Sequence, residues 1–478
     1  MTAAVSYLER SIRFYGVESA ESYRLAKENE TMGMALPRVV IVGGGFGGLN
    51  AARGLAHAPV QVTLIDQHNY HLFRPMLYQV ATGLLPAEEI AAPLRSVLKN
   101  QRNTDVLMAE VTGIDKENRL VRTRHDSIPY EYLILATGVQ YNYFGHDKWK
   151  ELAPSLTTVD DADRIRDRML ASFERAENLA ASDRGDQGEI QALMTFVLVG
   201  GGTTGVEMAG AIAELAKVSL ARDFRHIDPQ KARILLFEAG GRILAGFPEE
   251  FSEKALRRLV EMGVEVRTGT AVQQIEPDGV IVQGEKIACH NMIWAAGVVA
   301  SAAGEWLGAE VDKQGRVKVE ADLSVPGFPE IFVIGDTASV VAPTYNLVGM
   351  STGKTEQMAA VAPPAIQEGQ YVARVIRRKA RGLHPPGPFA YWDKGSLAIV
   401  GRSFAVADLK IARFWGFLGW ALWLTVHILY LIGFANRLFV LLQWGISFWT
   451  NKRDVRILPS GPDEDSQPAQ AKASAATS

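Results

Sequence analysis

The chain has 478 residues, enough for roughly two to four domains with sizeable cores. Its 47% hydrophobic content is typical of a globular protein, and its formal net charge of −3 excludes the strongly basic surface of a nucleic-acid-binding protein. The single cysteine, Cys289, excludes a disulfide framework, an iron–sulfur cluster, a zinc site of several thiolates and redox chemistry by a cysteine pair, so any redox centre must be a bound cofactor.

Residues 1–36 are predicted to form an N-terminal extension. Glutamates recur through this stretch, which distinguishes it from an apolar secretory signal and from an acid-poor transit peptide. We therefore expect the protein to remain in a bacterial-type cytoplasm.

The stretch that follows has the pattern of a strand, a tight turn and a helix. A β-branched run over residues 38–42 leads into glycines spaced G-x-G-x-x-G at Gly43, Gly45 and Gly48. In this motif the first glycine makes the turn, the second lets a pyrophosphate approach the backbone, and the third lets the helix pack on the strand. The next apolar run ends in Asp66, whose carboxylate suits a ribose hydroxyl. Alone, the motif also fits a helix that merely packs closely on a sheet.

A second copy of the pattern favours dinucleotide binding. An apolar run over residues 196–199 is followed by Gly200, Gly202 and Gly205 and then by a predicted helix. A later strand ends in Glu238. Because a carboxylate accepts hydrogen bonds from a free ribose diol and repels a 2′-phosphate, this half is predicted to bind NADH rather than NADPH.

Two further strand ends complete the pattern. A buried strand over residues 132–135 ends in the small-residue turn Ala136-Thr137-Gly138, and an apolar strand over residues 331–334 ends in Gly335-Asp336. An acid at a strand end, with glycine allowing close approach, suits a hydroxyl group of a bound cofactor. Cys289 precedes another predicted strand and is expected to be a buried structural thiol.

The order of these motifs resembles the flavoprotein disulfide-reductase superfamily, whose members carry two dinucleotide-binding domains. The resemblance implies that the first glycine unit and the late Gly335-Asp336 hold FAD, while the inserted second unit holds NAD(P)H. Members that reduce disulfides or oxidise sulfide need a cysteine pair beside the flavin, which this chain does not have.

Three stretches, residues 68–83, 362–369 and 394–401, are more specifically similar to type II NADH:quinone oxidoreductases. That family carries an A-Q-x-A-x-Q motif at its quinone pocket. Ala362, Ala365 and Gln367 match the motif, but Pro363 stands where the first glutamine would be, so the hydrogen bonding to the quinone stays open.

The resemblance implies three catalytic residues. Glu207 matches a glutamate near nicotinamide and flavin that orients nicotinamide or relays a proton; alternatively, it only complements the helix dipole. Lys394 is expected near the flavin or quinone carbonyls, or is a solvated surface lysine. Gln367 is the candidate quinone hydrogen-bonding group, or an exposed helix residue. No metal site is expected.

The C-terminal region carries the membrane prediction. Residues 414–434 lack Asp, Glu, Lys and Arg, and a shorter apolar run follows. Tryptophans lie through both runs, and basic residues, Arg453 among them, flank them, as suits a lipid interface. We expect an interfacial amphipathic hairpin that docks residues of about 411–450 on the membrane; a transmembrane element and a buried dimer or core segment are the alternatives.

Together these features predict an α/β protein with two Rossmann-like dinucleotide-binding domains and a C-terminal docking region. The expected boundaries are 37–155 and 298–385 for the FAD domain, 156–297 for the NADH domain, 386–458 for the docking and dimerisation region, and 459–478 for a disordered tail.

The predicted function is hydride transfer from NADH to FAD followed by two-electron reduction of a membrane quinone, without proton pumping. The enzyme is expected to be a peripheral homodimer at the cytoplasmic face of a bacterial inner membrane. The alternatives are a flavin-dependent reductase of a soluble or protein acceptor and a non-catalytic redox sensor.

Overall fold

A computed structural model describes residues 36–182, 185–450, 453 and 455–458. The predictions for an N-terminal extension and a C-terminal tail fall outside these residues, apart from Leu36. The chain forms two compact units. Within the described residues, unit 1 comprises 36–71, 92–140 and 299–394, and unit 2 comprises 72–91, 141–298 and 395–458.

Unit 1 is built on a six-stranded sheet in the order β20-β21-β9-β1-β2-β5. The central strand β1 (Arg38–Val42) pairs in parallel with β2 (Gln61–Asp66) and β9 (Tyr132–Leu135). Val39 to Val42 are almost fully buried, because a strand covered on both faces needs a continuous apolar run. The outer strands are β5 (Thr104–Met108), β21 (Phe328–Val333) and the antiparallel β20 (Ser324–Val325).

Two helices of unit 1 pack closely on each other. They are α3 (Phe46–Gly54), which follows β1, and α12 (Ala362–Lys379). The remaining elements are α5 (Leu94–Leu98), α11 (Ala303–Leu307), the hairpin sheet β6 (Val111–Asp115), β7 (Leu120–Thr123) and β8 (Ser127–Pro129), the pair β19 (Val317–Lys318) and β22 (Ala338–Ser339), and the sheet β23 (Val341–Tyr345), β24 (Ser351–Gln357) and β25 (Tyr391–Trp392).

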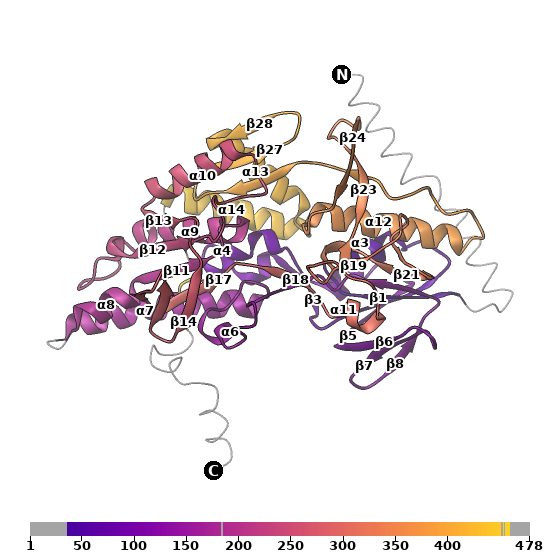
Figure 1. The fold of residues 1–478 in the computed structure, drawn as a ribbon, viewed down its shortest axis with the longest axis horizontal. Coiled ribbons are helices and arrows are strands. Elements are labelled where there is room, and N and C mark those ends of the chain that lie inside the picture. Colours follow the sequence, from indigo (N-terminus) through magenta and orange to yellow (C-terminus); the bar gives the residue numbers. More distant parts are fainter. Residues whose placement is uncertain (1–35, 183–184, 451–452, 454, 459–478) are drawn as a thin grey trace, which may run out of the picture. The chain divides into compact units, whose positions relative to one another are not determined.

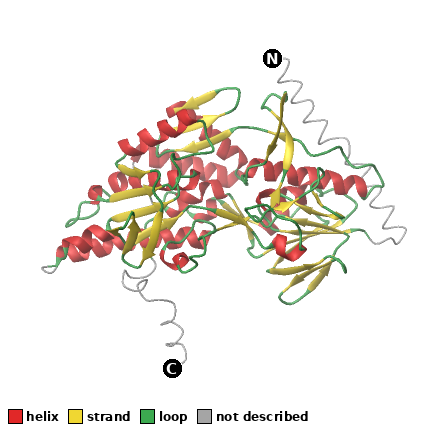
Figure 2. Ribbon diagram, in the orientation of Figure 1, coloured by secondary structure: helices red, strands yellow, loops and turns green. Residues whose placement is uncertain are grey.

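Unit 2 repeats the design on a four-stranded parallel sheet, β13-β12-β11-β17. Its strands are β11 (Thr195–Val199), β12 (Arg233–Phe237), β13 (Val264–Arg267) and β17 (Asn291–Trp294). Helices α7 (Val159–Ala181), α8 (Gln187–Leu193), α9 (Thr203–Glu214) and α10 (Glu249–Glu261) accompany this sheet, and Figure 2 shows the helices and strands of each unit.

The other elements of unit 2 are shorter. They are α4 (Leu77–Ala81), α6 (Trp149–Leu152), a π-helical turn at Leu215–Ser219, the sheet β14 (Val272–Glu276), β15 (Gly279–Val282) and β16 (Glu285–Ala288), and the sheet β26 (Ser396–Ile399), β27 (Ala405–Asp408) and β28 (Arg413–Trp415). The pairs β3 (Tyr70–Leu72) with β4 (Ala91–Pro93) and β10 (Val139–Tyr141) with β18 (Val298–Ala300) stand where the chain passes from one unit to the other.

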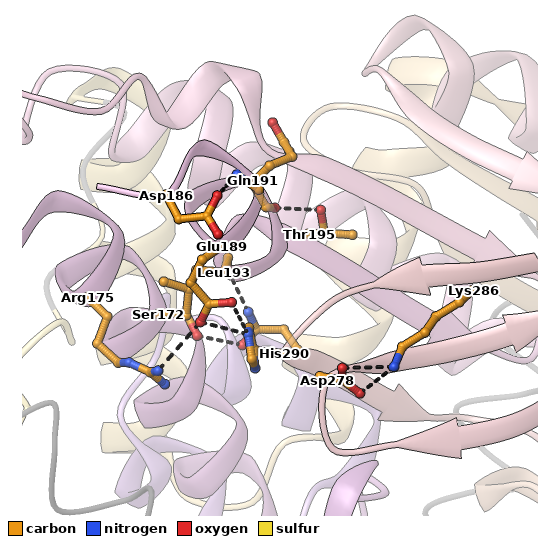
Figure 3. Close-up of polar contacts among 12 residues, drawn as sticks. Ser172, Arg175, Asp186, Glu189, Gln191, Leu193, Thr195, Asp278, Lys286 and His290 are labelled. Atoms are coloured by element: carbon orange, nitrogen blue, oxygen red, sulfur yellow. Dashed lines mark hydrogen bonds and ion pairs between the residues drawn. The ribbon is translucent and has the colours of Figure 1, made fainter. Parts of the chain in front are cut away.

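A polar cluster ties helices α7 and α8 to β17 in unit 2 (Figure 3). The Nε2 atom of His290 lies 3.0 Å from Glu189 Oε1, and Ser172 donates a hydrogen bond of 3.1 Å to Asn291. Asn291 in turn donates to the carbonyl of Leu193 at the end of α8. Because the polar groups of this cluster satisfy one another, it fastens the two helices to the sheet.

The thiol of Cys289 lies in the apolar core of unit 2. Its side chain is fully buried among residues such as Val280 and Met292, and burial raises the pKa of the thiol to about 12. A thiol that keeps its proton is not a nucleophile. The prediction of a structural cysteine is confirmed.

The C-terminal apolar run forms two helices, α13 (Gly416–Tyr430) and α14 (Phe434–Thr450), separated by residues 431–433. Among the described residues, no helix has both the length and the apolar character needed to cross a bilayer. The run over 414–434 is therefore not a single continuous helix.

Candidate active site

The first glycine turn has the geometry that its spacing predicts. Gly43 has φ +103°, and a Cβ there would lie 2.3 Å from the carbonyl oxygen of Ala136. A Cβ at Gly48 would lie 1.8 Å from the carbonyl oxygen of Gly43, because α3 packs directly on the turn. A Cβ at Gly45 would meet no atom within 4 Å. The backbone at Gly45 is thus open to a ligand at the N-terminus of α3.

The second turn reproduces this geometry residue by residue. Gly200 has φ +113° and abuts the backbone of Ala295, and a Cβ at Gly205 would lie 1.8 Å from the carbonyl oxygen of Gly200. A Cβ at Gly202, like one at Gly45, would meet nothing within 4 Å. Both turns therefore leave open the one position at which a pyrophosphate would approach.

The two strand-end acids also make matching contacts. Asp66 accepts hydrogen bonds from the N–H of Gly44 at 2.6 Å and from that of His68 at 2.7 Å. Glu238 accepts from the N–H of Gly201 at 2.6 Å and from that of Gly240 at 2.6 Å. Each carboxylate is thereby held beside its glycine turn with lone pairs left for the two hydroxyls of a ribose.

The small-residue strand ends of unit 1 lie together. The hydroxyl of Thr137 lies 2.5 Å from that of Ser301 and 3.3 Å from that of Thr337, and Thr337 donates to the carbonyl of Gly138. Thr337 directly follows Gly335-Asp336, so the fold brings residues 136–138 and 335–336 to one place.

Glu368 of α12 is a buried acid that the sequence reasoning missed. It accepts a 2.5 Å hydrogen bond from the N–H of Gly335, and burial raises the pKa of its carboxyl to about 8. The helical spacing of Ala365, Glu368 and Val372, all buried, is the signal that places it on the inner face of α12.

Unit 2 contains a cavity of about 540 Å³ beside α9. Six of its lining residues show its composition: Tyr78 and Gln79 of α4, Glu207 of α9, Trp423 of α13, and Trp444 and Phe448 of α14. Charged side chains line the cavity as well, among them Glu214, Lys217, Arg258 and Arg402, so aromatic rings and charged groups share its wall.

Glu207 is the predicted catalytic residue that this cavity contains. Its side chain is 8% exposed, and burial raises the pKa of the carboxyl to about 8, opposed by a hydrogen bond from the backbone N–H of Ile399. Near neutral pH the carboxyl is therefore mostly protonated and can donate a proton. The catalytic role of Glu207 stays a prediction.

The other two candidates lie in unit 1. The side-chain amide of Gln367 makes a reciprocal pair with Trp392, donating to its carbonyl at 2.9 Å and accepting from its N–H at 3.0 Å. Lys394 is exposed and follows Trp392 by two residues. Gln367 keeps a second N–H and a second lone pair beyond this pair, and the roles of both residues stay predictions.

The sequence interpretation of Arg453 as a lipid-flanking basic residue is wrong. Arg453 is 3% exposed, lines the cavity, donates to the carbonyl of Thr82 at 2.7 Å and lies 3.3 Å from Glu214. Burial raises the pKa of the Glu214 carboxyl, and the positive charge of Arg453 lowers it by a smaller amount. The reason is tertiary: Arg453 lies in the core, and the N–H of Val455 donates to the carbonyl of Gly83.

Tyr78, Gln79 and Glu214 are also lining residues that the sequence reasoning did not single out. Tyr78 and Gln79 belong to the aromatic loop that resembles the quinone oxidoreductases, which was the available signal. No sequence signal marks Glu214, because its neighbours have the pattern of an ordinary helix.

These features fit a dinucleotide in each unit. The open positions at Gly45 and Gly202 and the oriented acids Asp66 and Glu238 supply a phosphate cradle and a ribose acceptor twice over. Comparison with known proteins agrees: the family model for pyridine nucleotide-disulphide oxidoreductases matches residues 37–369.

Two curated relatives decide the subfamily. The chain is 42% identical to the type II NADH:quinone oxidoreductase Ndh of Mycobacterium tuberculosis over 87% of this chain and 89% of that protein. It is 41% identical to NdhA of the same organism, over 87% and 88%. The chain belongs to the type II NADH:quinone oxidoreductases. Membership confirms the predicted family and the predicted two-domain α/β fold.

A solved structure shares the fold. NDH2 from Plasmodium falciparum, in complex with NADH, superposes with a TM-score of 0.77 at 21% identity, covering 88% of this chain and 99% of that one. The single cysteine separates this oxidoreductase from disulfide-reducing members of the wider family.

Proposed function

We propose that this chain oxidises NADH and reduces a membrane quinone by way of bound FAD, without transporting protons. The family gives the reaction class. The observation that carries the proposal is the cavity of unit 2, because a buried, protonated carboxyl stands in it within walls supplied by the C-terminal apolar helices. A quinone needs both an apolar path and a proton donor.

The two glycine units divide the dinucleotides between them. Gly43, Gly45, Gly48, Asp66, Ala136, Thr137, Gly138, Gly335 and Asp336 of unit 1 would hold FAD, and Gly200, Gly202, Gly205 and Glu238 of unit 2 would hold NADH. Bound FAD supplies hydride acceptance from NADH and electron delivery to the quinone.

The residues of the chain position the substrates and move protons. Glu207 delivers a proton to a quinone oxygen from its protonated carboxyl, which burial maintains. Lys394 and Gln367 do not line the cavity of unit 2, and their roles are proposed on the family resemblance alone: the ammonium of Lys394 would stabilise negative charge that develops on a carbonyl oxygen, and the second amide N–H of Gln367 would be a hydrogen-bond donor. Glu238 disfavours the 2′-phosphate of NADPH by charge repulsion.

Helices α13 and α14 would dock the enzyme on the cytoplasmic face of the membrane as a peripheral protein. Large apolar side chains on them are exposed, among them Leu418 at 67%, Phe434 at 82% and Phe439 at 56%. Exposed apolar area of this extent marks an interaction site, and residues 411–450 supply it. The same region would carry the homodimer contact.

Stopped-flow spectroscopy tests the reaction. NADH should bleach the flavin absorbance faster than NADPH does, and decyl-ubiquinone should restore it within the turnover time. Rapid NADH oxidation with ferricyanide but none with decyl-ubiquinone would instead identify a reductase of soluble acceptors.

Docking is tested with surface substitutions, because α13 and α14 also contribute buried side chains and cannot be removed cleanly. Phe439→Asp and Leu442→Asp should weaken sedimentation with phosphatidylglycerol vesicles, since both side chains are more than half exposed on α14. Val260→Asp on α10, also exposed, is the matched control. Equal loss in all three variants would contradict docking through α14.

A further inference from the structure

Three side chains in unit 2 form a hydrogen-bonded chain that ends at the cavity. The indole Nε1 of Trp444 donates to Gln79 Oε1 at 2.7 Å. The amide Nε2 of Gln79 donates to the hydroxyl oxygen of Tyr78 at 2.8 Å. All three residues line the cavity that also contains Glu207.

The direction of this chain is fixed by chemistry. An indole N–H can only donate, so the Gln79 atom that faces Trp444 must be the oxygen, and the nitrogen must face Tyr78. The hydroxyl oxygen of Tyr78 therefore accepts from Gln79, and its proton has to point elsewhere. Among the described residues, no acceptor is found for that proton.

Burial keeps the phenol protonated. Tyr78 is 6% exposed and Gln79 is 2% exposed. Burial raises the pKa of Tyr78 well above its usual value, and the nearby carboxyl of Glu207 raises it further. The phenol thus stays a neutral donor across the working pH range.

Packing holds Trp444, the first donor of the three hydrogen-bonded side chains, in place. The ring of Trp444 lies 5.7 Å from that of Trp423, which is 2% exposed and stacks on His427 at 3.9 Å. Trp444 stands on the inner face of α14, while neighbours such as Leu441 and Leu442 are exposed. Trp444 on α14, the helix with the proposed lipid-facing surface, thereby sets the direction in which the Tyr78 hydroxyl donates.

We infer that Tyr78 is the hydrogen-bond donor to a carbonyl oxygen of the quinone, and that Gln79 and Trp444 are positioning residues that hold its proton toward the ligand. This inference rests on the proposed function and adds to it a recognition group and its support. A quinone carbonyl oxygen can only accept a hydrogen bond, so a donor whose direction is fixed is complementary to it.

The test measures the dissociation constant of decyl-ubiquinone for the purified holoenzyme by calorimetry, together with KM and kcat for the same quinone. Tyr78→Phe removes the donor, Gln79→Met removes the link, and Trp444→Phe removes the indole N–H while keeping an aromatic ring. Each should raise the dissociation constant about tenfold, the value of one neutral hydrogen bond. Trp306→Phe in unit 1 is the control and should change nothing.

A double variant tests whether Trp444 acts through the hydroxyl of Tyr78 or only through its own packing. Once Tyr78→Phe has removed the phenol proton, adding Trp444→Phe should cost nothing more, whereas independent packing losses would add. Flavin bleaching by NADH and ferricyanide turnover should stay at the wild-type rate in every variant, which also shows that each variant has folded around its flavin.

Three results would overturn the inference: an unchanged dissociation constant in Tyr78→Phe, an unchanged constant in both Gln79→Met and Trp444→Phe, or full additivity in the double variant. Failure of the proposed function is seen separately. The wild-type holoenzyme would then reduce ferricyanide and neither bind nor reduce decyl-ubiquinone.

Discussion

The pH dependence of quinone reduction follows from the protonation of Glu207. Because the pKa of its carboxyl is about 8, the group is protonated in about nine molecules of ten at pH 7 and in about one of ten at pH 9. If the protonated form supplies the proton, the rate of the quinone step falls about tenfold over this range. Glu207→Gln has nothing to titrate, so its slower rate should be flat between pH 7 and pH 9.

The assay is sequential-mixing stopped flow. The enzyme is mixed with one equivalent of NADH and then with decyl-ubiquinone at a series of pH values, and return of the flavin absorbance gives the quinone step alone. The preceding bleaching by NADH is an internal control and should have the same pH profile in both proteins. A fall of the same size that persists in Glu207→Gln would assign the titration to another group and refute the reasoning.

Stability gives an independent readout of the same carboxyl. The folded pKa lies above the usual 4.5, so between these values the folded protein holds a proton that the unfolded chain has released. The contribution of Glu207 to the free energy of unfolding therefore falls as pH rises, by about 1.4 kcal/mol per unit. Urea denaturation should show a steeper decline in wild type than in Glu207→Gln.

Three further predictions follow from the described contacts. Gly48→Ala should prevent stable folding because its methyl would lie 1.8 Å from a carbonyl oxygen, whereas Gly45→Ala should fold but retain less FAD, as flavin content after gel filtration would show. Arg453→Met should lower the free energy of unfolding by about 3 kcal/mol in urea titrations, because it breaks a largely buried ion pair, and Arg456→Met on the same segment, at the surface, by less than about 1 kcal/mol. Glu238→Gln should narrow the preference for NADH over NADPH in kcat/KM about tenfold, and an unchanged ratio would remove Glu238 from cofactor selection.

The dinucleotide turns could be predicted from the sequence because their chemistry is local. Three glycines at fixed spacing, a strand before them and a helix after them dictate the turn, whatever the rest of the chain does. The structure accordingly places Gly43, Gly45 and Gly48 in the geometry their spacing implies. The strand-end acids follow from the same logic, since they stand one strand further along a parallel sheet.

The cavity could not be predicted in this way, because its wall is assembled from segments far apart in the chain. Two tryptophans in similar apolar stretches differ in burial: Trp423 is 2% exposed and Trp449 is 85% exposed. Arg453 has the sequence context of a basic end of an apolar run, yet it pairs with Glu214, 239 residues earlier. Which side of an amphipathic segment meets protein rather than lipid is decided by tertiary packing.

Helix α9 explains how one small element can serve two substrates. In the proposed function its N-terminus, at the open backbone of Gly202, would hold the pyrophosphate of NADH, while Glu207 lies five residues further on and lines the cavity. Five residues of α-helix advance about 7.5 Å along the axis. A Cβ at Gly210 would lie 2.8 Å from the backbone N of Gly401, so the helix cannot shift without moving the loop that follows β26. If Gly202 and Glu207 have the proposed roles, a substitution that displaces this helix should impair NADH binding and quinone reduction together.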